Sequence, residues 1–107
     1  IFLISALFLI FCYPVNSIEL STISIDKYIN KISNKFSNTY CNTTKFGISK
    51  EGAISFALGE TNKEFKNKKL NHLIDYSLLK QNILNNLQNN CNEFNFPPEK
   101  LDELKLD

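Results

Sequence analysis

Few residues in this chain have the types and the spacing that chemistry requires. His72 is the only histidine, and no cysteine or carboxylate cluster with metal-ligand spacing accompanies it. Glu60 and Glu64 would share one face of a helix, but exposed carboxylate pairs without a burying pocket are ordinarily solvated rather than catalytic. No glycine-rich phosphate loop is present. We therefore expect no catalytic residue, no metal site and no cofactor, and hence no enzyme.

The remaining reactive groups are cysteines, and their chemistry depends on the compartment. Residues 1–13 (IFLISALFLIFCY) are almost entirely apolar and are followed by Pro14-Val15-Asn16-Ser17, with small residues at the positions that a leader peptidase reads. The apolar run is shorter than the roughly 20 residues that a membrane span needs. A cleaved signal peptide over residues 1–17 is favoured over a retained anchor. The expected mature chain is one domain, residues 18–107.

Three stretches have the apolar periodicity of helices: residues 24–40, 50–66 and 70–91. Ser24 and Ser49 precede the first two, where an N-cap hydroxyl stabilises the free amides of a first turn. The polar segment 41–44 predicts a loop. A tail, residues 92–107, follows the third stretch. In it Phe94 and Phe96 are expected to cover the core, and Pro98 to begin a short helical turn.

These helices predict an all-α fold, a small three-helix bundle of up-down-up topology, because short connections make neighbouring helices antiparallel. Cys41 follows the first helix and Cys91 ends the third, so both should lie at the same end of the bundle. An exported chain would form a Cys41–Cys91 disulfide, which would contribute about 4 kcal/mol by closing a loop of about 50 residues. Two buried free thiols are the alternative. A redox-active pair is disfavoured, because it ordinarily uses a Cys-x-x-Cys arrangement.

The charged residues of the chain limit the classes of partner that it could bind. Twelve lysines, no arginine and eleven acids leave a net charge of +1, which argues against nucleic-acid binding. The up-down-up order would bring lysines of the first helix close to those near the second turn. The expected contact surface consists of Lys27, Lys31, Lys35, Lys63, Lys66, Lys68, Lys69, Phe94 and Phe96. It would suit an acidic protein or an anionic membrane, and the alternative is an ordinary solvated face.

Three segments carry a resemblance to a known group: residues 36–41 (FSNTYC), residues 46–53 (FGISKEGA) with 56–60 (FALGE), and Cys91 ahead of Phe94 and Phe96. They resemble small exported proteins of cyanobacteria with a signal peptide, two cysteines and helical structure. The resemblance covers residues 36–96 and implies a periplasmic or thylakoid-lumen location. The activity of that group is not established, so no catalytic residues are carried over.

The sequence predicts a non-enzymatic interaction protein that is secreted to the periplasm or thylakoid lumen, where it would be an accessory to a membrane complex. Its partner would be another protein or a membrane surface. Phe46, Phe56 and Tyr76, together with Phe94 and Phe96, would supply an apolar patch. The alternative is a small-molecule carrier with an apolar pocket between its helices. An enclosed pocket would favour the carrier, and an exposed aromatic surface the interaction protein. The sequence does not indicate an oligomeric state.

Overall fold

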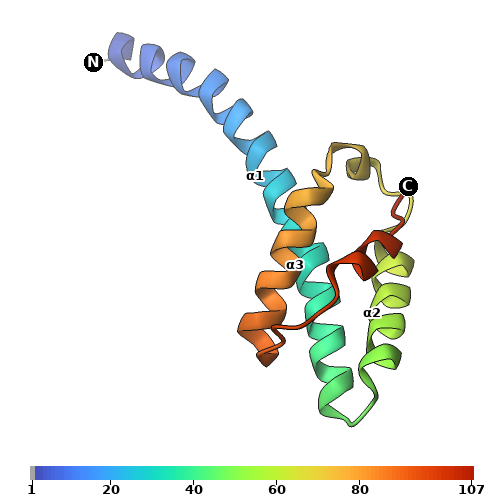
Figure 1. The fold of residues 1–107 in the computed structure, drawn as a ribbon. Coiled ribbons are helices and arrows are strands. Elements are labelled where there is room, and N and C mark those ends of the chain that lie inside the picture. Colours follow the sequence, from blue (N-terminus) through green and yellow to red (C-terminus); the bar gives the residue numbers. More distant parts are fainter. Residues whose placement is uncertain (1) are drawn as a thin grey trace.

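The computed structural model describes the backbone of residues 2–107 and the side chains of residues 24–107. The elements in chain order are α1 (Phe2–Lys45), α2 (Lys50–Phe65), the 3₁₀ helix η1 (Lys69–Leu73), α3 (Tyr76–Cys91) and the 3₁₀ helix η2 (Pro98–Glu103). The prediction of an all-α, up-down-up bundle of three helices with one disulfide is confirmed (Figure 1). The predicted signal peptide, residues 1–17, lies outside the described side chains and stays a prediction.

The predicted first helix, residues 24–40, is part of the longer α1, and the loop expected at residues 41–44 is wrong. The side-chain hydroxyls of this segment could have competed with the helix for backbone hydrogen bonds. They donate instead to carbonyl groups of the preceding helical turn, as Thr43 Oγ1 does to Thr39 O at 2.6 Å. The helix ends at Lys45, and Gly47 follows in the left-handed region, where its φ of +92° suits glycine. Gly47 N donates to Thr44 O and Ile48 N to Thr43 O, which is the Schellman pattern of a helix end.

The second helix agrees closely with the predicted residues 50–66. Ser49 is the N-cap, and its Oγ accepts from Gly52 N at 3.1 Å. The predicted apolar face is buried: it consists of Ile54, Ala57, Leu58, Thr61 and Phe65, with Ala53 beside it. Ala53 and Ala57 are fully buried, since their small side chains allow close packing.

The third predicted helix, residues 70–91, is wrong in its first part. η1 ends at Leu73, and α3 begins only at Tyr76. The Asp75 carboxylate accepts from the amides of Ser77 and Leu78 and so caps a new helix, which ends the preceding segment. Leu70 and Leu73, which belong to the predicted third helix, lie in η1 instead and are exposed.

α1 is the central helix of the bundle. It packs against both α2 and α3, whereas no Cα atom of α2 lies within 8 Å of one of α3. Asparagines at four-residue intervals link α1 to α3: Asn82, Asn86 and Asn90 donate from Nδ2 to Oδ1 of Asn30, Asn34 and Asn38 at 3.4, 3.0 and 3.4 Å. The constant register shows that the two helices run parallel, one turn per pair.

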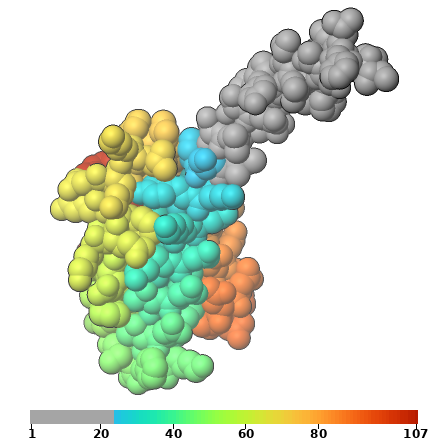
Figure 2. Space-filling view, turned by 180° about the vertical axis from the view of Figure 1, so that it is seen from behind, coloured from blue at the N-terminus to red at the C-terminus, as the bar shows by residue number. Residues whose placement is uncertain are grey.

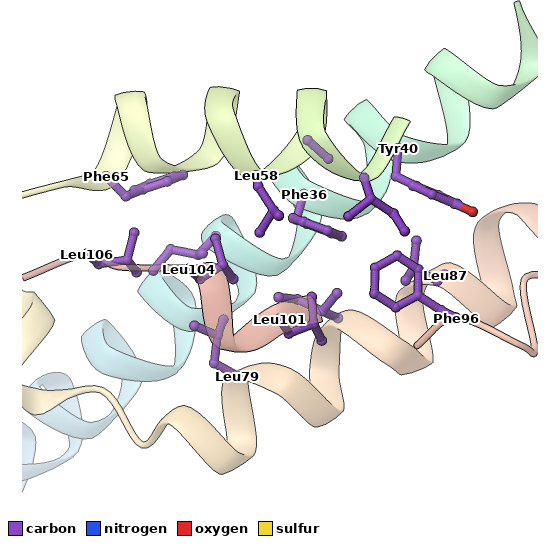
Figure 3. Close-up of a cluster of buried hydrophobic side chains, with 14 of the residues drawn as sticks. Phe36, Tyr40, Leu58, Phe65, Leu79, Leu87, Phe96, Leu101, Leu104 and Leu106 are labelled. Atoms are coloured by element: carbon purple, nitrogen blue, oxygen red, sulfur yellow. The ribbon is translucent and has the colours of Figure 1, made fainter. Parts of the chain in front are cut away.

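The tail after α3 occupies the space between α2 and α3. Phe96, Leu101, Leu104 and Leu106 are buried there against Leu58, Phe65, Leu79 and Leu87 of the two helices (Figure 3). The expected turn at Pro98 is present as η2. Phe96 covers the core as predicted, but Phe94 does not, because its side chain is 67% exposed. The tail is thus a fourth part of the core, which helical periodicity could not indicate.

Candidate functional site

The disulfide joins α1 to the end of α3. Cys41 and Cys91 are bonded, with their Cα atoms 5.7 Å apart, and both side chains are half-buried. Both sulfurs are therefore in the bond, so neither is a thiolate that could act as a nucleophile. The pair is structural in this state.

A polar network lies beside the disulfide. Tyr40 OH donates to Glu93 Oε2 at 2.8 Å, and Lys50 Nζ donates to Glu93 Oε1 at 3.4 Å and to Asn95 O at 3.0 Å. Burial, and then the hydrogen bond to Glu93, raise the pKa of Tyr40 well above its ordinary value. Desolvation acts to raise the pKa of Glu93, but the hydrogen bond from Tyr40 and the charge of Lys50 outweigh it and lower that pKa. A neutral phenol and a firmly ionised carboxylate fasten the tail to α1 and α2, and neither is poised to transfer a proton near neutral pH.

A second polar junction forms at the other end of the bundle around Asn71, which is only 3% exposed. Its Oδ1 accepts from Tyr28 OH at 2.6 Å, and its Nδ2 donates to Phe65 O at 2.8 Å and Leu106 O at 2.6 Å. One amide thus ties α1, α2 and the tail together. Two of these bonds are buried and the third, from Tyr28, is partly buried, so the amide has a structural role.

The predicted lysine surface is assembled in part. Lys31 of α1 lines an open hollow of about 510 Å³ together with Lys68 and Lys69, and Tyr28, Phe65 and Leu70 supply its apolar lining. Glu64 also lines the hollow and forms an ion pair with Lys35 at 4.0 Å. The other predicted lysines, Lys27, Lys63 and Lys66, are exposed. Figure 2 shows η1 (yellow) beside the first described turns of α1 (blue).

The two predicted aromatic members lie elsewhere. Phe96 is in the core, where its ring packs edge-on against Tyr40 at 5.3 Å, so its place on a contact surface is wrong. Phe94 is exposed, but the contacts of Lys50 with Glu93 and Asn95 place that segment near the start of α2, at the disulfide end. The lysines and these aromatics do not form one surface.

A separate apolar surface lies at the turn between α1 and α2, and we call Phe46, Ile48 and Phe56 the apolar cap. Phe46 is 86% exposed, and Ile48 and Phe56 are about half exposed. Ile48 and Phe56 line a shallow hollow of about 380 Å³ with Thr43 and Gly52. A Cβ on Gly52 would lie 3.0 Å from Ile48 Cγ2, so the glycine leaves room for the isoleucine. Phe46 and Phe56 were predicted from sequence, but Ile48 was not, although Gly47 signals the turn that exposes it.

Within the described part of the chain, no group of three or more His, Cys, Asp or Glu side chains could surround a metal ion. No helix of that part is long and apolar enough to cross a membrane. His72 is exposed on η1. The lysine-lined hollow and the apolar cap lie at opposite ends of the bundle.

No protein-family model, curated protein or solved structure matches this chain.

Proposed function

We propose that this chain is an exported, non-enzymatic interaction protein that acts in the periplasm or thylakoid lumen as an accessory to a membrane complex. The apolar cap is the observation that carries the proposal. Exposing two phenylalanines and an isoleucine at one turn leaves apolar area in water, which docking on another protein would remove. Aromatic side chains of this kind commonly anchor protein interfaces.

The filled interior supports a docking protein over a carrier. A carrier would need an apolar cavity between its helices. In this fold the space between α2 and α3 is occupied by Phe96, Leu101, Leu104 and Leu106 of the tail (Figure 3). The two surface hollows described above are shallow and open to solvent, which favours contact with a large partner over enclosure of a small molecule.

The polar groups support a structural protein over an enzyme. Glu93, Tyr40 and Asn71 are all engaged in bonds that connect elements of the fold. The disulfide supports export, because such bonds persist in oxidising compartments and are rare in the cytosol.

Isolation of the native complex tests this function. The tagged chain, expressed from its own leader, is recovered from the exported fraction, and its intact mass reports whether residues 1–17 are removed. We expect a partner protein to co-purify at a fixed ratio and Phe46→Ser/Phe56→Ser to lose it while unfolding at the same urea concentration.

Phe94→Ser is the matched control, because it removes an aromatic residue outside the apolar cap whose exposed fraction, 67%, lies between those of Phe46 and Phe56. It should keep the partner. A chain that migrates alone through native separation, or a double variant that retains the partner fully, would refute the proposed function.

A further inference from the structure

The end of the bundle opposite the apolar cap is rich in uncompensated positive charge. We call Lys27, Lys31, Lys66, Lys68, Lys69, Leu70 and Leu73 the lysine pole. Lys31, Lys68, Lys69 and Leu70 line one hollow, and Lys27 lies one turn before Lys31 on the same face of α1. Within the described residues, none of the five lysines has a carboxylate within 4.0 Å.

The acids near this pole do not neutralise it. Glu64 is paired with Lys35, and the Asp75 carboxylate accepts from the first amides of α3. Asp26 and Asp107 also lie near this end, next to Lys27 and close to Tyr76 respectively. Lys35 offsets Glu64, so among the described residues five lysines stand against the three carboxylates of Asp26, Asp75 and Asp107, which leaves an excess of positive charge.

Exposed leucines stand among these lysines, and the fold explains why. The bonds of Asn71 hold its side chain inward, so the residues around it in the tight 3₁₀ turn must point outward. Leu70 is 38% and Leu73 48% exposed as a result. Apolar side chains flanked by lysines match the boundary between lipid headgroups and acyl chains, where leucines enter and ammonium groups stay with phosphates.

We propose that the lysine pole docks on a bilayer containing anionic phospholipids, with the lysine-lined hollow around headgroup phosphates. A lysine ammonium pairs with a phosphate as a point charge. The exposed Leu70 and Leu73 among these lysines favour a lipid surface over an acidic protein, because a bilayer offers phosphates and acyl chains side by side. The proposal does not rest on the proposed function, because it uses the other end of the molecule.

Vesicle binding tests this proposal. The full chain is mixed with vesicles of phosphatidylcholine alone, or with about 30% phosphatidylglycerol added, and the bound fraction is measured by flotation. Any apolar contribution of residues 1–13 is common to both vesicle types, so the ratio of the two affinities reports the effect of lipid charge. We expect the wild type to prefer anionic vesicles by at least about thirtyfold at about 0.1 M salt.

The lysine pair Lys68→Gln/Lys69→Gln should lower that ratio roughly tenfold to thirtyfold. The matched control is Lys45→Gln/Lys100→Gln, which removes the same charge at exposed positions away from the pole and should change the ratio less than about threefold. Leu73→Ser should weaken the binding that survives in about 0.5 M salt, since apolar insertion is not screened.

Three outcomes would overturn the proposal. Equal affinity of the wild type for both vesicle types would exclude recognition of lipid charge. An equal loss in the two lysine pairs would show that net charge, rather than this pole, matters. A Leu73→Ser protein that binds as tightly as the wild type in high salt would exclude leucine insertion.

Discussion

Replacing Asn71 with alanine is expected to lower the free energy of unfolding by about 3 kcal/mol, because it removes three hydrogen bonds, two buried and one partly buried, worth about 1 kcal/mol each. The loss is not larger, since Leu106 O keeps a second donor, Asn67 N at 2.8 Å. Tyr28→Phe removes only one of the three bonds and should cost about 1 kcal/mol.

Asn71→Asp separates the contributions of the two faces of this amide. It keeps an acceptor for Tyr28 OH but sets a carboxylate oxygen against the two carbonyls that the Nδ2 group now contacts. Its pKa in the folded state should be raised, because the site disfavours the charged form. Its stability deficit should therefore be smallest below the ordinary carboxyl pKa and grow as the pH rises from there through the raised pKa of the folded state.

Urea unfolding of the oxidised proteins, followed by helical circular dichroism, measures these differences. Amide exchange at Asn67 should also accelerate in Asn71→Ala, because the end of the tail loses one of its two anchors. If Asn71→Ala and Tyr28→Phe destabilise equally, or if Asn71→Asp shows no pH dependence, the junction does not join the three elements as described.

Three further predictions concern turns, packing and the cross-link. Gly47→Ala should lower the free energy of unfolding by about 1–2 kcal/mol, because the φ of Gly47 is +92°. Gly59→Ala should raise it by about 0.5–1 kcal/mol, because a Cβ at this helical position meets no atom within 4 Å. Equal effects of the two substitutions in urea unfolding would contradict the backbone argument. Thr61→Val should raise the free energy of unfolding by about 1 kcal/mol, since the buried Thr61 hydroxyl has no hydrogen-bond partner among the described residues. A lower thermal unfolding midpoint of the variant would show that this hydroxyl does form a hydrogen bond. Serine at both Cys41 and Cys91 should cost about 4 kcal/mol for a sequence separation of 50 residues, and an unchanged urea midpoint would count against that estimate.

Sequence reasoning succeeded for the second helix. Its N-cap, its apolar face and its end near residue 66 depend on residues within a few positions of one another, and these are visible as spacing. The up-down-up topology could also be predicted from sequence, because short connections leave few possible arrangements of three helices. The prediction of the disulfide rested on that topology.

The contact surface was predicted less well. Lys31, Lys68 and Lys69 do meet around one hollow, as antiparallel neighbours allow. Phe96, however, could not be separated from Phe94 by pattern, since both are apolar and only two residues apart. Phe96 is buried because it packs against Tyr40, whereas Phe94 stays exposed.

The sequence alone determined the helical class, the turn at Ser49 and the end of the bundle at which two cysteines meet, since periodicity, capping and chain connectivity act over short distances. The tertiary structure decided that the tail completes the core, that Asn71 is buried ahead of α3, and that Lys69, Leu70 and Leu73 of η1 face outward together. Each of those outcomes depends on partners far apart in the chain, such as Asn71 and Leu106 at a separation of 35 residues or Tyr28 and Asn71 at 43. Burial and hydrogen bonding between such partners exist only once the chain has folded, so no local pattern records them.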